Sequence, residues 1–446
     1  MKCSAFAIFW HRFCADQRGT VAIIVALSII GLVGTAGIGV DYYNALAAKS
    51  RLDLASDAAA IGAINAAQNY IEANSATQTD PALSNSAIAA GKAQALKVFN
   101  SNAGSTVNIA AAPTITMSRS GQTFNANITY QASSKNAFGP IFGVQQMNFN
   151  GTSASSLTMG KYLDFYLLLD VSGSMGLPTT TAGQSQLAGL SPDTKDQYPS
   201  GCAFACHFSQ KMCSTIQYPQ NVGPRQTCQG YNLARSNNIV LRADSVGSAV
   251  QSLLSTAMAT ETIKNQFRVG LYPFISHTGT LYALSSNLNA ATTSAGTLGS
   301  LLDTGQSTTA YGSGGTHFEN AIPELNALIP PNGTTIGTGS AASSPQPFVF
   351  LVTDGADNNQ YYTTSTNKWT GSQPQNMDPT LCSDFKNRGI TVSVLYIPYP
   401  PINPPNPKFA GDEDDKVNAI IPDIPTTLEQ CASPGFYFTA YTPQDI

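Results

Sequence analysis

Residues 19 to 40 contain no charged side chain and are rich in Ile, Val, Ala and Gly. A helix of about 20 residues, at a rise of about 1.5 Å per residue, spans the core of a bilayer. A cleaved signal peptide is the alternative, but its apolar region is usually about 7–15 residues long and ends near an A-x-A-like site. This stretch is longer, and no such site closely follows it. The sequence therefore predicts a retained transmembrane helix over residues 19–40.

Basic residues on the two sides of this span predict its orientation. More of them precede the span than closely follow it, namely Lys2, Arg12 and Arg18 before it and Lys49 and Arg51 after it. The side that is richer in Lys and Arg stays in the cytoplasm. We therefore expect residues 1–18 to be cytoplasmic and the chain beyond Asp41 to lie on the other side of the membrane.

Small residues recur at four-residue spacing within the span, at Gly31, Thr35 and Gly39. Such a stripe lets two membrane helices approach closely. Glycine is also common in membrane helices that do not associate, so the stripe admits a homo-oligomer without requiring one.

Composition narrows the classes of function. Only 11% of the 446 residues are charged and the net charge is −4, so no basic patch predicts binding to nucleic acid. The chain contains no G-x-x-x-x-G-K-[ST], H-E-x-x-H or G-x-S-x-G motif. His317 is expected to be a loop residue and not a catalytic base. We therefore expect a protein without enzymatic activity.

The segment from 41 to 160 is predicted to form one structural part. Residues 41–73 are rich in Ala and lack Pro, which favours a long helix that continues from the membrane span. A shorter helix is expected around residues 87–99. Between residues 107 and 158, polar and apolar residues alternate with period two, which predicts a small antiparallel sheet packed on the helix as a platform.

Two patterns connect this segment to a family. An R-G pair, Arg18-Gly19, precedes the apolar run, and Leu52 to Ala60 follow the pattern L-x-x-A-x-D-A-A-A. The segment resembles the N-terminal part of Tad pilus-assembly proteins of the TadE and TadG type. Type IV pilins carry a Glu five residues after their processing glycine, where this chain has Ile24. The resemblance therefore implies a permanent, single-pass anchor in a bacterial inner membrane, with the C-terminal domain in the periplasm.

An apolar run, Phe165 to Leu169, leads into the motif D-x-S-x-S, formed by Asp170, Ser172 and Ser174. A continuous apolar run of this length is typical of a buried parallel strand. One carboxylate and two hydroxyls offer oxygen ligands to a hard cation such as Mg²⁺ or Mn²⁺. Asp and Ser are also common in turns and helix caps after strands, so this motif alone leaves both interpretations open.

Two later segments favour the metal site. Gly314-Gly315-Thr316 precedes a predicted helix, and a second apolar strand ends in Thr353-Asp354-Gly355. Loops at the carboxyl ends of parallel strands are where open α/β sheets bind ligands. The three motifs in this order resemble the metal-ion-dependent adhesion site (MIDAS) of a von Willebrand factor A domain.

The resemblance implies a set of ligands. Ser172, Ser174 and Thr316 would coordinate the ion through their hydroxyls, and Asp170 and Asp354 would do so directly or through water. A sixth position would remain for a carboxylate of a partner protein. Other hydroxyls of the same loop region could replace that of Thr316, namely those of Thr304, Thr308 and Thr309.

Strands and helices alternate through residues 161–446, which predicts a doubly wound, mostly parallel α/β sheet. The predicted elements are strand 163–169, helix 236–258, strand 267–275, helix 318–328, strand 347–353, helix 378–388 and strand 390–397. The helix usually expected after the last strand is missing from the pattern. Either something else covers that edge, or the domain is shorter than its relatives.

Six of the eight cysteines follow the predicted span. Four of them lie in a predicted insertion, residues 177–235, and the six are Cys202, Cys206, Cys213, Cys228, Cys382 and Cys431. An even number in an oxidising compartment predicts three disulfides. We expect Cys382 to pair with Cys431 and the other four to pair among themselves in unknown order. A zinc site built on C-A-F-A-C-H is the alternative, although its spacing fits no common zinc site.

These patterns together imply a membrane-anchored periplasmic protein with a von Willebrand factor A-like domain. Its partners would be envelope or pilus-assembly proteins that present a carboxylate to the bound Mg²⁺ or Mn²⁺. In this role it would help to assemble or anchor a Flp/Tad-type pilus. One alternative is a surface adhesin that binds an external ligand directly, and another is a metal-free structural scaffold.

Overall fold

The computed structural model of the chain divides into two compact units, Met1–Met159 and Gly160–Ile446, which we describe separately. The structure describes residues 19–104, 108–109, 111–190, 203, 229–303, 311–312, 314–330, 336–359, 361–363, 368–370, 374–399, 401–402 and 413–441.

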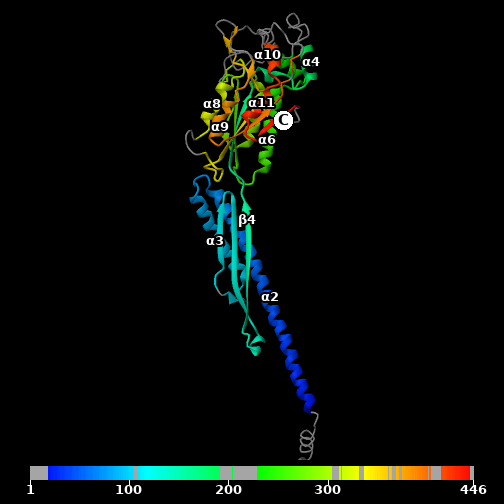
Figure 1. Ribbon diagram of the computed structural model, residues 1–446, viewed down its shortest axis with the longest axis vertical. Helices are drawn as coiled ribbons and strands as arrows, with labels where there is room; N and C mark the ends of the chain where they lie inside the picture. Colours follow the sequence, from blue (N-terminus) through cyan, green and yellow to red (C-terminus); the bar gives the residue numbers. More distant parts are fainter. Residues whose placement is uncertain are drawn as a thin grey trace, which may run out of the picture. The chain divides into compact units, whose positions relative to one another are not determined.

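The first unit is built on a single unbroken helix, α2 (Gly19–Asn74), which runs from the apolar stretch into the alanine-rich segment (Figure 1). Large apolar side chains of its first part are exposed, including Ile23, Ile24, Leu27, Ile30 and Leu32. Among the described residues, α2 is the one helix that is long and apolar enough to cross a membrane. This agrees with a single-pass membrane anchor.

The second half of α2 packs against α3 (Ala82–Ala103), the helix expected around residues 87–99. The buried face of α2 consists mainly of alanines at helical spacing, among them Ala55, Ala59, Ala63 and Ala67, together with Leu52 and Ile71. By contrast, Leu46, Leu54 and Ile61 are exposed. Because alanines make the contact, the leucines and isoleucines of this segment do not reveal its packing face in the sequence.

Four strands of the first unit form the expected antiparallel sheet. They are β1 (Asn108–Ile109), β2 (Thr114–Ser120), β3 (Thr123–Lys135) and β4 (Gln146–Thr158). β3 pairs with β4 along its whole length and with β2 and β1 on its other edge. Alternate residues of β3, among them Phe124, Ile128 and Tyr130, are buried, and both long strands contact α2.

The second unit contains a mixed six-stranded sheet in the order β14-β13-β8-β5-β6-β7. The strands are β5 (Leu163–Asp170), β6 (Phe267–Phe274), β7 (Tyr282–Ser285), β8 (Gln346–Thr353), β13 (Thr391–Tyr396) and β14 (Tyr437–Thr439). Neighbouring strands are parallel except for β6 and β7. The antiparallel edge strand β7 was not expected from the sequence.

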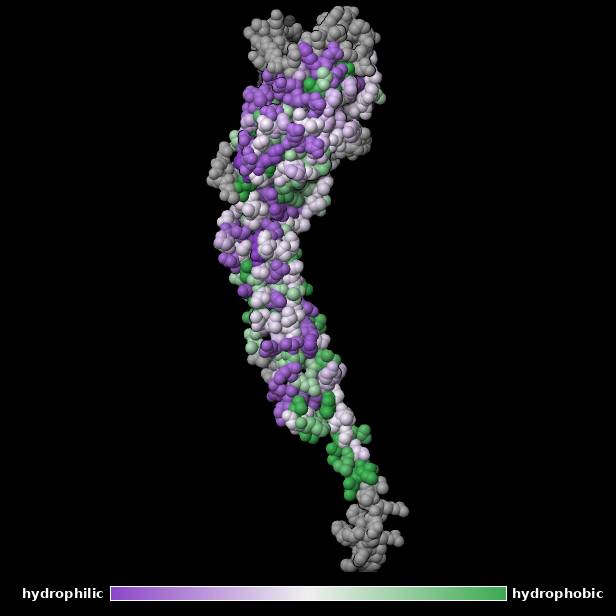
Figure 2. All heavy atoms as spheres, viewed as in Figure 1, coloured by the Kyte–Doolittle hydropathy of each residue, from purple (hydrophilic) through white to green (hydrophobic). Residues whose placement is uncertain are grey.

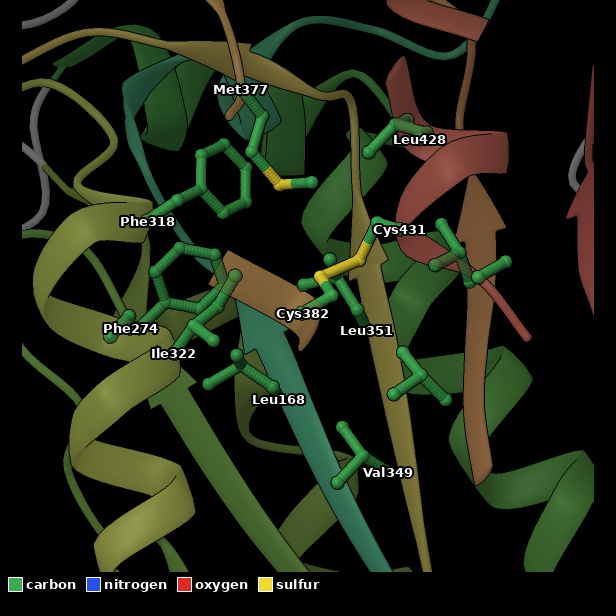
Figure 3. Packing of buried hydrophobic residues seen from close by; sticks show 14 of the residues in the cluster. Leu168, Phe274, Phe318, Ile322, Val349, Leu351, Met377, Cys382, Leu428 and Cys431 are labelled. Carbon is green, nitrogen blue, oxygen red and sulfur yellow. A yellow bond between two sulfur atoms is a disulfide. The ribbon is translucent and has the colours of Figure 1, made fainter. Parts of the chain in front are cut away.

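Successive side chains of β5 point alternately into two hydrophobic clusters, one on each face of the sheet. Tyr166 and Leu168 pack with α8 (Phe318–Leu328) and α11 (Ile424–Cys431), as Figure 3 shows for part of this cluster. Leu167 and Leu169 pack with the other cluster, which includes α6 (Arg242–Thr260) and α7 (Leu288–Ala295). Helices therefore pack on both faces of this mixed sheet.

The last part of the chain corrects the expectation of a missing final helix. α10 (Glu413–Ile420) and α11 follow β13, and the short strand β14 pairs with β13 in parallel register, Leu395 opposite Phe438. The edge beside β13 is thus covered by a further strand. The predicted helix 378–388 is divided into a 3-10 turn, η6 (Pro379–Cys382), and a short helix, α9 (Ser383–Asn387).

The predicted insertion contains two helices, α4 (Thr181–Gly189) and α5 (Gln229–Ser236). The helix expected from residue 236 begins instead at Arg242, as α6. The remaining short elements are η1 (Gly139–Phe142), η2 (Gly173–Gly176), η5 (Leu298–Leu301), β9 (Ala356–Asp357), β10 (Tyr361–Thr363), β11 (Lys368–Thr370) and β12 (Gln375–Asn376). Four predicted disulfide cysteines lie outside the described residues, namely Cys202, Cys206, Cys213 and Cys228.

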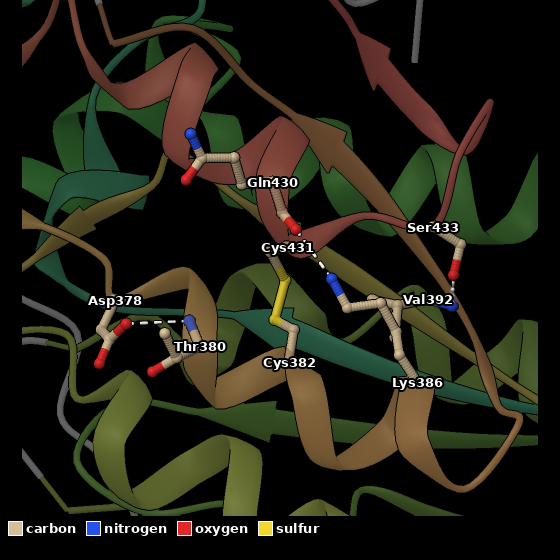
Figure 4. Close-up of a disulfide and its surroundings, with 8 residues drawn as sticks. All are labelled: Asp378, Thr380, Cys382, Lys386, Val392, Gln430, Cys431 and Ser433. Atoms are coloured by element: carbon tan, nitrogen blue, oxygen red, sulfur yellow. Dashed lines mark hydrogen bonds between the residues drawn. A yellow bond between two sulfur atoms is a disulfide. The ribbon is translucent and has the colours of Figure 1, made fainter.

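Cys382 and Cys431, which the sequence analysis pairs, form a disulfide that joins η6 to the end of α11 (Figure 4). Both cysteines are buried in the same cluster as Leu168. Beside the bond, the Lys386 ammonium donates a hydrogen bond to the Gln430 carbonyl at 2.8 Å. These links hold α11 against η6 and α9.

Candidate metal centre

The first part of the site lies where β5 ends. Asp170 is its last residue and is fully buried. Its Oδ1 accepts a hydrogen bond from the Ser172 backbone N–H at 2.9 Å, which fixes the loop that leads into η2. The hydroxyl oxygens of Ser172 and Ser174 lie 3.2 Å apart. The motif D-x-S-x-S thus brings a carboxylate and two hydroxyls to the carboxyl end of a central strand.

The end of the neighbouring strand β8 brings the second carboxylate. The Thr353 hydroxyl donates a hydrogen bond to Asp170 Oδ2 at 2.6 Å, which links the two strand ends. Asp354 follows and is fully buried. Gly355 has a φ of +78°, and a Cβ there would lie 2.5 Å from an Ile424 methyl carbon. Glycine is therefore required for the turn that places Asp354 beside the first loop.

A cation of the protein itself reaches this end of the sheet. Arg242, the first residue of α6, places its Nη1 3.1 Å from Asp354 Oδ2. Its Nη2 donates to the Pro398 carbonyl at 2.6 Å, and its guanidinium lies 4.9 Å from the centre of the Tyr399 ring. The guanidinium is thus fixed on several sides, and Asp354 has a permanent counter-charge.

Burial dominates the electrostatics of the two carboxyl groups. Burial, followed by the charge of Asp354, raises the pKa of Asp170 to about 7, against the hydrogen bonds from Ser172 and Thr353. Burial also raises the pKa of Asp354, although Arg242 and Ser174 act in the opposite direction. The pair therefore favours any additional positive charge placed between its members.

The third predicted loop reaches the same end of the sheet through its backbone. Thr316 is buried. Its N–H donates a hydrogen bond to the Asn358 carbonyl at 2.7 Å, and the Asn358 N–H donates one to the Thr316 carbonyl at 2.9 Å. Asn358 lies just after β9, beyond the turn that carries Asp354. These backbone bonds place Thr316 beside that turn but do not assign its hydroxyl to the two carboxyl groups. Thr304, Thr308 and Thr309 lie outside the described residues.

Asp303 connects the first and third loops, a role that the sequence analysis did not predict. Its N–H donates to the Val171 carbonyl at 2.8 Å, and its Oδ2 accepts from the Gly314 N–H at 2.6 Å. Both nitrogens of the His317 ring are engaged, one with the Gly314 carbonyl at 3.1 Å and the other with Glu319 at 2.9 Å. The His317 ring thus links Gly314 to Glu319 and stabilises the loop that carries Thr316.

The donor set suits a hard divalent cation. Buried carboxylate oxygens and serine hydroxyls, without sulfur or imidazole, are ligands of the kind that Mg²⁺ and Mn²⁺ prefer. Among the described residues, no three His, Cys, Asp or Glu side chains group as a metal cluster, so an ion here would depend on the hydroxyls. Ser172, Ser174 and Asp170 could hold it, with Asp354 shared between the ion and Arg242.

The sequence offers little signal for Arg242. It lies 112 positions from Asp354 and stands at the start of a helix, where an arginine is usually solvated. Its neighbour Leu241 donates an N–H to the Asp244 carboxylate at 3.1 Å, which starts α6 and orients Arg242. Because the helix was expected to begin at residue 236, the sequence did not place Arg242 at a helix start.

Several solved structures are similar to this chain at low TM-score. BatB from Bacteroides thetaiotaomicron matches 64% of this chain and 96% of its own, at 14% identity and a TM-score of 0.29. Proximal thread matrix protein 1 from the mussel byssus, with a zinc-occupied MIDAS motif, matches 64% of this chain and 46% of its own, at 13% identity and 0.30. The match to the pilus adhesin SpaC from Lactobacillus rhamnosus GG covers 76% of this chain and 32% of the adhesin, at 12% identity and a TM-score of 0.30.

This chain therefore spans less than half of the mussel protein and about a third of the adhesin. No family model matches the chain, and no curated protein matches it. At these TM-scores the likenesses carry no argument about function, which has to rest on the residues of the site.

Proposed function

We propose that this chain is a membrane-anchored protein whose second unit binds partner proteins through a metal-bridged carboxylate. The observation that carries the proposal is the pairing of two fully buried carboxyl groups, Asp170 and Asp354, with the hydroxyls of Ser172 and Ser174 at one end of the sheet. Mg²⁺ or Mn²⁺ bound there would supply an open coordination position for a carboxylate of the partner. The role is binding and not catalysis.

Different residues would have different roles in the proposed metal site. Ser172 and Ser174 provide neutral oxygens, so the ion would keep a net positive charge that attracts an acidic partner. Thr353 and the Ser172 N–H orient Asp170 through hydrogen bonds. Arg242 compensates the charge of Asp354 when no ion is bound. This division would allow the site to release and rebind its ion without unfolding.

We further propose that the partners are envelope or pilus-assembly proteins of a Flp/Tad-type pilus, on the resemblance carried by Arg18-Gly19 and Leu52 to Ala60. The anchor helix supports a place in a membrane. The resemblance favours the inner membrane, and the excess of basic residues before the span favours a periplasmic second unit. In cells that build such a pilus, the Ser172→Ala/Ser174→Ala variant should lose surface pili. The exposed Ser252→Ala on α6 is the matched control and should retain them. Normal piliation in the double variant would contradict the proposal.

Two alternatives give different results. A surface adhesin would be cleaved by protease added to intact cells, whereas a periplasmic protein would be protected. A metal-free scaffold would capture the same partners with EDTA as with Mg²⁺. Protection from protease together with EDTA-sensitive capture supports the proposed function over both.

A further inference from the structure

The hairpin between β3 and β4 ends in a tip, residues 136–145, that carries no charge. The tip includes η1 and exposes several large apolar side chains. Ile141 is 71% exposed, Phe142 51% and Val144 48%. A contiguous group of exposed apolar side chains marks an interaction surface more often than a free one.

The tip packs directly on the apolar part of α2. A Cβ on Gly37 would lie 2.5 Å from Phe138 Cγ, and a Cβ on Gly34 would lie 2.6 Å from Phe142 Cζ. The contact at Gly37 is with the root of the Phe138 side chain, so glycine is needed there, whereas the contact at Gly34 is with the far end of the Phe142 ring. At about 1.5 Å per residue, Gly34 lies about 10 Å from Asp41 along the helix, inside the predicted span. Figure 2 shows hydrophobic residues gathered at this tip and along the adjoining helix.

Asp41 holds the tip at this position. It is the first charged residue after the apolar run, and it is buried. Its carboxylate accepts three consecutive backbone N–H groups, from Ala137 at 2.7 Å, Phe138 at 2.9 Å and Gly139 at 2.7 Å. Charge-assisted hydrogen bonds of this kind are among the stronger ones in proteins. The bonds also satisfy three donors of the tip.

The remaining backbone of the tip is largely satisfied from within. Asn136 N–H donates to the Gln145 carbonyl, Val144 N–H to Gly139, Ile141 N–H to Phe138 and Gly143 N–H to Pro140, all at 3.0–3.1 Å. Non-helical backbone can lie at membrane depth only where its polar groups find partners in the protein. Lys135, exposed at the base of the tip, is placed to extend its ammonium to lipid headgroups.

We propose that the hairpin tip 136–145 is a second membrane contact, inserted into the leaflet that contains the Val40 end of the apolar stretch 19–40. The occupant of its apolar surface is lipid, because the surface continues the exposed apolar face of a helix that fits a membrane span. Asp41 is the positioning residue that couples the tip to the helix. The inference requires that α2 crosses a membrane, but it does not depend on the metal centre.

Fluorescence quenching by lipid tests this contact. The full chain would carry Ile141→Trp, with Trp10 and Trp369 replaced by Phe, in phosphatidylcholine vesicles whose acyl chains are brominated or not. The matched control places the tryptophan at Asn125, an exposed position at the opposite end of β3. Bromine in the acyl chains should quench the Ile141→Trp protein strongly and the Asn125→Trp protein hardly at all.

Two results would overturn the proposal. Equal, weak quenching of both proteins by brominated lipid would show that the tip lies outside the bilayer. Protection of the Ile141→Trp protein from aqueous iodide without quenching by lipid would show that a second copy of the chain covers the tip instead. In the Asp41→Asn background, lipid quenching at position 141 should fall toward the control. Unchanged quenching would exclude Asp41 as the positioning residue.

Discussion

The Arg242 guanidinium and the Asp354 carboxylate form an ion pair that is almost completely closed to solvent, with 1% and 0% of their side chains exposed. The pair joins the start of α6 to the end of β8, at the place where the candidate metal site is built. Removal of one member of a buried pair leaves the other charge without compensation. Arg242 therefore links the stability of the second unit to the charge state of the site.

Arg242→Gln should make the second unit dependent on divalent metal. The free energy of unfolding should fall by about 3–5 kcal/mol in EDTA, because Asp354 loses its buried counter-charge. Mg²⁺ should restore part of this loss by supplying another cation. Urea unfolding of the full chain in detergent, with and without Mg²⁺, measures both effects. Arg268→Gln is the control, since Arg268 pairs with Asp164 at the other end of β5 and is partly exposed. Equal recovery of both variants with Mg²⁺ would contradict the account.

The double variant Cys382→Ala/Cys431→Ala should unfold more readily, without losing its response to metal. The two cysteines are 49 positions apart in the sequence. Disulfides typically contribute about 2–4 kcal/mol to the free energy of unfolding. Alanine is chosen because both sulfurs are buried in an apolar cluster. Urea unfolding under oxidising conditions measures the change. An unaltered midpoint would show that the packing of α11 suffices without the bond.

Asp357 should make the second unit less stable as the pH rises through the weakly acidic range. Burial, with a further contribution from the charge of Glu319, raises the pKa of Asp357 from its ordinary value of 3.8 to about 6. Between these two values the folded state binds more protons than the unfolded state, so stability falls as the pH rises and is lowest above about pH 6. Asp357→Asn should make this slope shallower, and the slope that remains comes from the buried carboxyl groups at the metal centre, whose pKa values are also raised. Urea unfolding in EDTA from pH 4 to 7 compares the two proteins, and parallel curves would disprove the assignment.

Gly37→Ala should loosen the hairpin tip, because its Cβ would collide with the ring of Phe138. Gly39→Ala is the matched control, two residues away on the same helix, where nothing lies within 4 Å of an added Cβ. Hydrogen exchange at the N–H groups bonded to Asp41 should be faster in the first variant than in the wild type. The control should exchange at the wild-type rate. Equal exchange in the two variants would contradict the observed packing.

Local patterns in the sequence predicted those residues of the candidate site whose positions depend on their neighbours in sequence. Asp170, Ser172 and Ser174 follow an apolar run, and the end of that run fixes their position at the edge of the sheet. Arg242 could not be predicted in this way, because its partner is distant in sequence. The position of Asp303, which bridges two loops, depends in the same way on tertiary contacts.

In the fold, too, elements with a clear local pattern were predicted, and elements that depend on tertiary contacts were not. The long helix and the alternation of β3 have clear periods, and the structure contains both elements. The three residues of β14 are too few to show a period, and its pairing with β13 depends on the path of the chain through α10 and α11. The packing face of α2 is made mainly of alanines, whose pattern is lost in an alanine-rich segment.

Direct binding of Mn²⁺ tests the central claim, that Asp170 and its neighbours form a metal centre. The electron paramagnetic resonance signal of free Mn²⁺ falls when the ion binds, so a titration of the full chain in detergent reports occupancy. We predict that the wild type binds an ion that Mg²⁺ displaces, and that the Ser172→Ala/Ser174→Ala variant, folded by circular dichroism, does not. Equal binding by the two proteins, or no binding by the wild type, would contradict the account.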